Sequence, residues 1–263
     1  MYSNTTANNN SAIGYQAMYT NTTGEYNTGL GYEALRSNTT GDKNHAVGYA
    51  ALYSNTTGES NTASGYEALY SNTTGYRNTA LGYQALRGGT TSGNNNVAIG
   101  ETAMYSLTTG SDNTAIGRES MYSGTTGSNN TAIGSEALYT NTTSGNNTAV
   151  GWQSLRSLQA NANQNTALGA RSMRSTTTGE FNTAAGNDSL YSNDSGDYNT
   201  AIGMQALYSN VSADKNTAIG YDSLYSNTTG VSNVASGYKA LYANSTGGYN
   251  AAFGQEALAA NTT

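Results

Sequence analysis

The 263-residue sequence contains no cysteine and no proline, and only 10% of its residues are charged. Without cysteine the chain can form neither disulfides nor thiolate metal sites. No apolar run approaches the roughly 18 residues of a membrane helix, so we expect no membrane insertion. The net charge of −6 provides no basic surface for nucleic acid. Leu, Ile, Val and Phe make up about 11% of the chain, which is too little for a conventional globular core.

A tandem repeat accounts for this composition. A phrase of the type Asn-Thr-Ala-Ile-Gly recurs with a spacing of 17 residues in twelve of fourteen intervals and of 18 residues in the other two. Its glycine marks fifteen units, and we number each unit from that glycine as position 0. Position 0 falls at residues 14, 31, 48, 65, 82, 100, 117, 134, 151, 169, 186, 203, 220, 237 and 254.

The units keep the same residue types at the same positions. Position −4 is always Asn, position −2 is Ala except for Gly29, position +3 is Ala or Ser, and position +4 is Leu or Met. Position +2 varies widely, with residues such as Glu33, Arg171 and Lys239, so we expect it to face solvent. Because a 17-residue unit cannot bury an apolar face alone, neighbouring units must stack and share one core.

The unit is too short for a helix pair or for a strand with a crossover helix. The sequence therefore predicts a mainly β fold, a parallel β-solenoid of about fifteen 17-residue coils, as a single repeat-array domain over residues 1–263. With strands about 4.8 Å apart, the coils would form a rod of about 70 Å. The domain starts and ends within a repeat and shows no polar cap, so we expect a segment of a longer fibre or ends that join other copies.

The strand of each coil is predicted at the Asn-x-Ala-Ile-Gly phrase. Alternation along a strand places positions −4, −2 and 0 on the inner face and positions −3 and −1 on the other. The inner asparagines are expected to form a ladder in which each amide bonds its copies in adjacent coils. The outer face accepts Ser64, Ala185 and Phe253 at position −1, which suggests a contact between chains. The predicted ladder includes Asn27, Asn61, Asn113, Asn130, Asn182 and Asn216.

The segment from +1 to +7 is expected to contain a short helical or 3₁₀ turn. Such a turn places positions 0, +3, +4 and +7 together and sends +2 and +6 outward. The Asn-Thr-Thr-Gly stretch that follows is predicted to be a corner. Its glycine at +10, as at Gly24 and Gly230, is expected to supply a positive φ.

Two of the phrases, residues 113–117 and 216–220, are each followed by two variable residues and then by Ser-Met or Ser-Leu. They resemble the head repeats of trimeric autotransporter adhesins, and they resemble even more the repeats of bacteriophage tail-fibre-like proteins. The resemblance covers essentially the whole chain. It implies a trimer of parallel solenoids that serves as an extracellular stalk or adhesive fibre.

No group of residues in the sequence matches a catalytic or metal-binding pattern. The single histidine, His45, occupies a strand position that usually holds Thr, and the acidic residues at +2 are expected to form a solvated stripe. The sequence contains neither a phosphate-binding loop nor a calcium-binding solenoid repeat. We therefore expect no enzymatic activity, no cofactor and no metal.

Tyrosine lies mainly at positions +1 and +5. In stacked coils these residues would form two aromatic columns, interrupted at +5 by arginines that can stack on the rings. We interpret the columns as structural ladders or chain–chain contacts, with carbohydrate or surface adhesion as the alternative. The candidate contact residues are Tyr15, Tyr19, Tyr66, Tyr70, Tyr221, Tyr225, Tyr238 and Tyr242.

The corners also contain candidate glycosylation sites. Asparagine acceptors for N-linked sugar occur at Asn21, Asn38, Asn55 and Asn72. In a bacterial or phage protein these would usually be unmodified, and the corner hydroxyls, such as those of Thr22 and Thr39, could carry O-glycans instead.

Together these features predict a non-enzymatic extracellular fibre protein that acts as a rigid shaft or adhesin. Its partner would be itself, as a homotrimer or an end-to-end filament, and cell-surface glycan is a further candidate partner. An ice-binding or glycan-binding solenoid is the alternative. The Thr column at −3 favours ice binding, whereas the aliphatic column at −1 argues against it.

Overall fold

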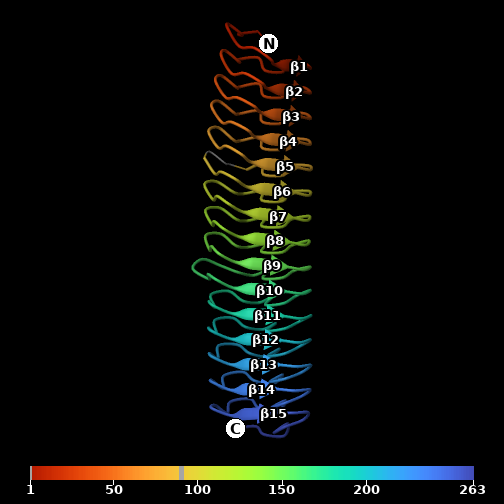
Figure 1. Ribbon diagram of the computed structural model, residues 1–263, viewed down its shortest axis with the longest axis vertical. Coiled ribbons are helices and arrows are strands. Elements are labelled where there is room, and N and C mark those ends of the chain that lie inside the picture. Colours follow the sequence, from red (N-terminus) through yellow and green to blue (C-terminus); the bar gives the residue numbers. More distant parts are fainter. Residues whose placement is uncertain (1, 89–91) are drawn as a thin grey trace. The chain divides into compact units, whose positions relative to one another are not determined.

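A computed structural model describes residues 2–88 and 92–263, and the chain divides into two compact units, Met1–Asn129 and Asn130–Thr263. Each unit is a stack of coils with one three-residue strand per coil (Figure 1). The parallel β-solenoid with a repeat of about 17 residues is therefore confirmed. The first unit contains β1 (Ser11–Ile13), β2 (Thr28–Leu30), β3 (His45–Val47), β4 (Thr62–Ser64), β5 (Thr79–Leu81), β6 (Val97–Ile99) and β7 (Thr114–Ile116). The second contains β8 (Thr131–Ile133), β9 (Thr148–Val150), β10 (Thr166–Leu168), β11 (Thr183–Ala185), β12 (Thr200–Ile202), β13 (Thr217–Ile219), β14 (Val234–Ser236) and β15 (Ala251–Phe253).

Within each unit the strands pair in parallel, and equivalent residues face one another. Thr200 pairs with Thr217 and Ile202 with Ile219, one repeat apart. The 18-residue interval between β9 and β10 keeps the same register, because the extra residue lies in the loop after β9, which projects beyond its neighbours in Figure 1. Every coil is thus placed directly on its copy.

The interior of each coil is narrow and filled by small residues. Alanine at −2, Ala or Ser at +3, and Leu or Met at +4 point inward, as Ala201, Ala206 and Leu207 do with no exposed surface. Most coils therefore bury a single large aliphatic side chain, and Leu107 and Leu158 at +7 add a second one in two coils. This requirement explains the low aliphatic content of the sequence.

The predicted helical or 3₁₀ turn is wrong, because the described part of the chain contains no helix. Positions +2 and +4 instead have a left-handed backbone, with φ of 52° at both Glu67 and Leu69. The N–H of Glu67 donates to the carbonyl of Tyr49 (2.8 Å) and that of Leu69 to the carbonyl of Ala85 (3.0 Å), so these bonds join different coils. Packed helices would need 8–10 Å between their axes, which the strand spacing of about 4.8 Å does not allow.

The left-handed residues also decide which side chains fit. A left-handed residue breaks the alternation of an extended chain, so the adjacent side chains of Ala206 and Leu207 both point into the core. The left-handed region strongly disfavours β-branched side chains. Among the described non-glycine residues with positive φ, Thr102 is the only β-branched one. Position +4 therefore accepts Leu and Met but no Val or Ile.

Glycine has different roles at positions 0 and +10. At position 0, Gly203 has φ of 132°, and a Cβ there would lie 2.5 Å from the carbonyl oxygen of Gly220 in the next coil. The glycines at +10 lack the positive φ that we predicted for them. A Cβ on Gly24 would instead overlap the carbonyl oxygen of Gly41, so glycine is used at this corner because successive coils approach closely.

We predict that Leu207→Ile, which conserves side-chain volume, lowers the free energy of unfolding by about 1–3 kcal/mol, because a β-branched residue is strained in the left-handed region. Leu207→Met should cost less than about 1.5 kcal/mol, since Met173 occupies the same position in another coil. Urea unfolding followed by circular dichroism measures both variants. Equal losses for the two substitutions would contradict the account of position +4.

Candidate interaction surfaces

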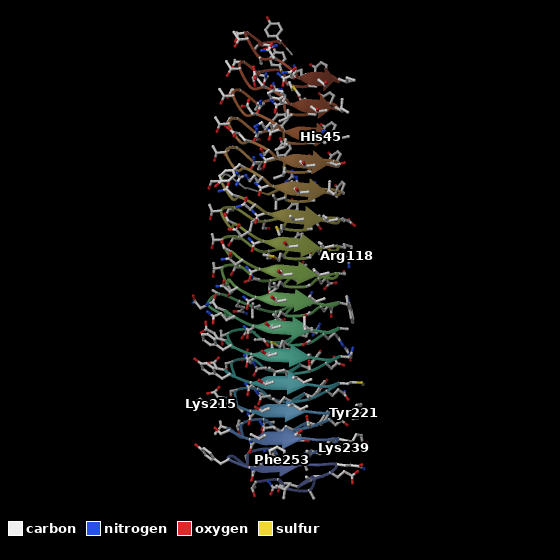
Figure 2. All side chains as sticks on the ribbon, viewed as in Figure 1. His45, Arg118, Lys215, Tyr221, Lys239 and Phe253 are labelled. Atoms are coloured by element: carbon white, nitrogen blue, oxygen red, sulfur yellow. The ribbon has the colours of Figure 1, made fainter. Side chains whose placement is uncertain are left out.

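Positions −3 and −1 form the outer face of the sheet in each unit. Along β13, Ala218 is buried, whereas Thr217 is half-buried and Ile219 is 42% exposed. Ile202 on the adjacent strand is 43% exposed. His45, marked on β3 in Figure 2, is the only ionisable residue at these positions in the described coils. Each unit therefore presents a partly apolar sheet face, without Asp, Glu, Lys or Arg in its described coils.

The predicted asparagine ladder at −4 is confirmed. Asn113 donates to Oδ1 of Asn96 from its backbone N–H (3.0 Å) and from Nδ2 (3.1 Å), and Nδ2 also donates to the carbonyl of Gly127 (2.9 Å). Each amide thus links its strand to the preceding strand and to the corner that leads to the next one. The predicted members Asn27, Asn61, Asn113, Asn130, Asn182 and Asn216 are all buried.

A second asparagine ladder, at +7, contains the predicted acceptors of N-linked sugar. Nδ2 of Asn38 donates to Oδ1 of Asn21 (2.7 Å) and to the carbonyl of Gly41 (2.9 Å). An N-linked sugar replaces a hydrogen on Nδ2, so the folded coil has no room for one. The recurrence of Asn at the coil period is the sequence signal for this ladder. Asn21, Asn38, Asn55 and Asn72 are all 0% exposed.

The hydroxyls at +8, which include the candidate sites Thr22 and Thr39, also connect coils. Oγ1 of Thr22 donates to the carbonyl of Thr39 (2.9 Å), and Oγ1 of Thr39 donates to the carbonyl of Thr56 (3.0 Å). Both residues are half-buried. Their hydroxyls therefore support the stacking of the corners.

The two tyrosine columns form stacks within each unit. The ring centroids of Tyr15 and Tyr32 at +1 are 5.0 Å apart, and those of Tyr225 and Tyr242 at +5 are 5.3 Å apart. Stacking covers the ring faces, so the columns offer mainly ring edges and hydroxyls to the outside. Such a surface does not suit adhesion through face-on contact with a sugar. The predicted contact residues Tyr15, Tyr19, Tyr66, Tyr70, Tyr221, Tyr225, Tyr238 and Tyr242 all take part in these stacks.

The tyrosine columns and the corners lie on different edges. In the second unit, Figure 2 shows Tyr221 and Lys239 at one edge and Lys215 at the opposite edge. Tyr221 and Lys239 occupy positions +1 and +2, and Lys215 occupies position +12. Each unit therefore has a tyrosine edge, which carries positions +1, +2 and +5, and a corner edge.

Arginines at +5 join the tyrosine column through a recurring polar contact. Arg87 donates from Nε to Glu67 in the preceding coil (2.5 Å) and from Nη1 to the hydroxyl of Tyr105 in the following coil (3.2 Å). Its guanidinium carbon lies 5.4 Å from the ring centroid of Tyr70, within the range of a cation–π contact. The arginine therefore replaces one tyrosine of the column without breaking it.

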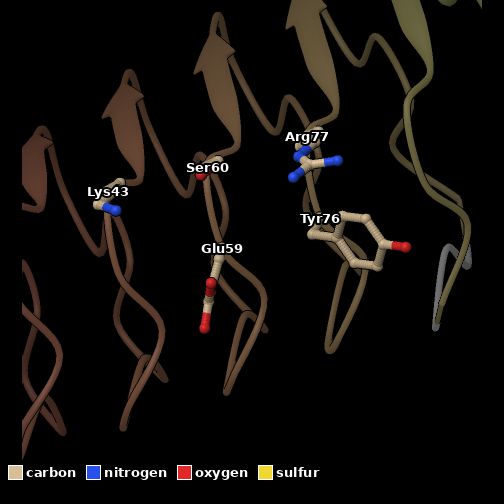
Figure 3. Close-up of a pocket in the computed structure, with 5 residues that line it drawn as sticks. All are labelled: Lys43, Glu59, Ser60, Tyr76 and Arg77. Atoms are coloured by element: carbon tan, nitrogen blue, oxygen red, sulfur yellow. The ribbon is translucent and has the colours of Figure 1, made fainter.

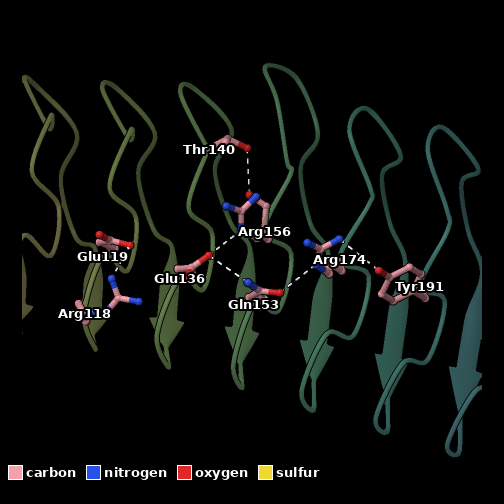
Figure 4. Close-up of polar contacts among 8 residues, drawn as sticks. All are labelled: Arg118, Glu119, Glu136, Thr140, Gln153, Arg156, Arg174 and Tyr191. Atoms are coloured by element: carbon pink, nitrogen blue, oxygen red, sulfur yellow. Dashed lines mark hydrogen bonds and ion pairs between the residues drawn. The ribbon is translucent and has the colours of Figure 1, made fainter.

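The same contact occurs twice in succession in the second unit (Figure 4). Arg156 and Gln153 both donate to Oε2 of Glu136, at 2.7 and 3.1 Å. Arg174 donates to Oε1 of Gln153 (2.9 Å) and to the hydroxyl of Tyr191 (3.1 Å). Position +2 is therefore not the continuous solvated stripe that we predicted: Glu67, Glu136 and Gln153 are half-buried partners of the arginines, whereas Glu256 is exposed.

Two carboxyl groups at +2 have opposite electrostatic environments. Burial raises the pKa of Glu67, but the hydrogen bonds from Arg87 and Gln84 outweigh burial and hold the pKa below its ordinary value. Burial raises the pKa of Asp222, and the charge of Lys239 offsets this only in part. Oδ1 of Asp222 is buried and accepts no hydrogen bond. Ionisation is thus favoured at Glu67 and disfavoured at Asp222.

A cleft of about 430 Å³ lies among the corner residues of the first unit (Figure 3). Lys43, Ser60 and Arg77 line it from position +12 of three consecutive coils, with φ between 55° and 57°. Glu59 and Tyr76 line it from position +11, and the guanidinium carbon of Arg77 is 5.6 Å from the Tyr76 ring centroid. The cleft therefore combines two cations, a carboxylate, a hydroxyl and an aromatic ring.

No protein-family model matches the chain, and no curated protein is significantly similar to it. Within residues 2–88 and 92–263, no group of three or more His, Cys, Asp or Glu residues is placed to hold a metal ion. The same residues form no helix able to cross a membrane. The sheet face, the tyrosine edge and the cleft are the surfaces with distinct chemistry.

We predict that Glu67→Gln reduces the pH dependence of stability. Because the folded pKa of Glu67 is lowered, its ionisation stabilises the fold above the unfolded pKa of about 4.3, and this stabilisation is lost as the pH falls through the folded pKa. Between about pH 6 and about pH 3, the wild-type chain should lose more free energy of unfolding than the variant. Urea unfolding at both pH values measures this difference.

The matched control is Glu256→Gln, whose carboxyl group is at the same repeat position but exposed. This control should follow the wild-type profile. Identical pH profiles for the wild type and Glu67→Gln would contradict the assigned ion pair.

Proposed function

We propose that this chain is a non-enzymatic shaft element of an extracellular fibre. The proposal rests on one observation: polar groups on every side of each coil form hydrogen bonds to the neighbouring coil. Backbone N–H groups of the strands, of the +1 to +5 segment and of the corners donate to neighbouring coils, and the two asparagine ladders add side-chain bonds. A unit built in this way resists extension and bending, as a shaft must.

The sheet face is the surface through which we propose that copies associate. Exposed apolar columns of this kind typically mark protein–protein contacts. A second copy carries the same columns at the same coil spacing, so each contact can repeat coil after coil and add to the total affinity. The charged residues of the repeat lie at other positions, mainly +2, +5, +11 and +12, and so do not oppose the approach of two sheet faces.

The assembly that we expect is a homotrimer of parallel solenoids. The resemblance of the Asn-Thr-Ala-Ile-Gly phrases to adhesin-head and tail-fibre repeats supports this choice. The alternative is a filament in which solenoids stack end to end. In that case contacts would be made by the edges of the sheet and not by its face.

Side-by-side association predicts that Ile202→Lys combined with Ile219→Lys gives monomers. Each lysine would bring an unpaired charge into an apolar contact, which is strongly unfavourable. Sedimentation velocity should show the wild type at a multiple of 27.2 kDa and the double variant at 27.2 kDa. The far-ultraviolet circular dichroism should be the same for both.

The matched control for this test is Ser232→Lys. It adds a lysine at position +12, where Lys215 already occurs in the same unit, and should leave the assembly intact. A wild-type chain that stays monomeric, or a double variant that assembles like the wild type, would contradict association through the sheet face. Long filaments in negative stain for both chains would favour end-to-end stacking.

A second candidate function is the binding of an acidic sugar polymer in the cleft. Lys43 and Arg77 can pair with sugar carboxylates, the ring of Tyr76 can pack on a sugar, and Glu59 and Ser60 can bond sugar hydroxyls. Arg77→Gln should weaken the binding of a uronate oligosaccharide at least tenfold in calorimetry. Lys215→Gln, at the same repeat position outside the cleft, should not change it. Equal affinities for all three chains would exclude the cleft as the site.

A further inference from the structure

Trp152 is the one aromatic residue at position +1 of the described coils that lies against no other ring. The tyrosines at +1 all form stacks, such as that of Tyr221 and Tyr238, whose ring centroids are 5.7 Å apart. At +1 of the coils before and after Trp152 stand Ser135 and Ala170, which have no ring. The indole of Trp152 therefore occupies a gap in the aromatic column.

The indole of Trp152 is also exposed and makes no polar contact within the described part of the chain. Trp152 is 49% exposed, and its Nε1–H group has no acceptor there. In the tyrosine stacks each ring covers the face of its neighbour, as in the consecutive rings from Tyr15 to Tyr83. No ring covers Trp152 in this way. It therefore gives the tyrosine edge the uncovered aromatic face that the tyrosine columns lack.

Polar groups of the following coils border this indole. The backbone N–H of Arg171 donates to the carbonyl of Trp152 (2.8 Å), so position +2 of the next coil lies directly beside it. Nη2 of Arg171 donates to Oδ2 of Asp188 (2.6 Å), which fixes the guanidinium and balances its charge. One coil further, the exposed side-chain amide of Asn187 has no partner among the described residues. The edge beside Trp152 thus offers hydrogen-bonding groups without a net charge.

We propose that Trp152 anchors a binding site for a neutral, β-linked saccharide on the tyrosine edge. The C–H groups on the face of a pyranose ring are slightly positive, and they pack favourably on the negative face of an indole. Glucose and N-acetylglucosamine units in β-linkage have equatorial substituents, so only C–H groups point from their faces. Their hydroxyl groups surround the ring, where Arg171 and Asn187 can form hydrogen bonds with them.

The spacing of the coils also suits a polymer that runs along the edge. One sugar unit of a β-linked chain is comparable in length to the coil spacing of about 4.8 Å. A sugar packed on Trp152 therefore places the next units beside the coils of Arg171 and Asn187. Contacts of successive units then add to the affinity of one chain.

Other ligand classes fit this site less well. A quaternary ammonium ion is typically held by a cage of several rings, whereas Trp152 is a single ring with the cation of Arg171 nearby. The net charge of −6 opposes nucleic acid. An acidic sugar needs an unpaired cation, but Arg171 is already paired with Asp188. The site is on the tyrosine edge, so the proposal does not depend on association through the sheet face.

The fluorescence of Trp152 tests the proposal directly, because it is the only tryptophan in the chain. Titration of the full chain with cellohexaose and with chitohexaose should shift the tryptophan emission along a saturating curve for at least one of them. In saturation-transfer NMR, Trp152→Ala should weaken the binding of that oligosaccharide at least tenfold. Emission that neither oligosaccharide changes, or a Trp152→Ala variant that binds like the wild type, would overturn the proposal.

Variants that keep Trp152 test whether its uncovered face is what binds. Ser135→Tyr combined with Ala170→Tyr introduces the commonest residue of position +1 on both sides of Trp152. The new rings should cover the indole and weaken binding at least tenfold, with an unchanged circular dichroism spectrum. Met204→Tyr introduces the same residue beside Tyr221 and should bind like the wild type. Wild-type affinity in the double variant, or an equal loss in Met204→Tyr, would contradict the site.

Discussion

The hydrogen-bonded ladder between equivalent residues of successive coils is the constraint on which the rest of the structure depends. Because each residue lies on its own copy, any side chain that the repeat keeps becomes a column. Asparagine columns become amide ladders, tyrosine columns become ring stacks, and the glycines at position 0 become contacts such as that between Gly203 and Gly220. The short spacing also explains the narrow interior, which holds one Leu or Met at +4 of each coil.

Much of this follows from the sequence, because the period alone fixes which residues must lie together. The strand and its inner Asn and Ala residues are predicted correctly from the alternation within one phrase, and the tyrosine columns from the stacking of coils. The helical turn is wrong because inward-facing neighbours such as Ala206 and Leu207 resemble a helical face when the backbone is not known. The signal against it was present: position +4 accepts Leu and Met but never Val or Ile, which is typical of a left-handed residue.

The tyrosine edge, the sheet face and the corners of the coil differ in how their polar groups are paired. The arginines at +5 form hydrogen bonds with acidic or amide partners at +2, as Arg87 does with Glu67. Most charged groups of the tyrosine edge therefore have partners within the chain. The sheet face of the described coils carries no Asp, Glu, Lys or Arg side chain. The corner hydroxyls at +8 donate to the next coil, as that of Thr22 does to the carbonyl of Thr39. Sequence reasoning did not single out these bonds, because they depend on the direction of each side chain at the corner, which the period does not determine.

The central claim is that equivalent residues of successive coils are stacked at the spacing of hydrogen-bonded strands. X-ray diffraction from the aligned protein tests it most directly. The account predicts a strong meridional reflection at about 4.8 Å, which is the repeat of every column. A reflection at about 5.4 Å, the pitch of an α-helix, with none at the strand spacing would contradict it.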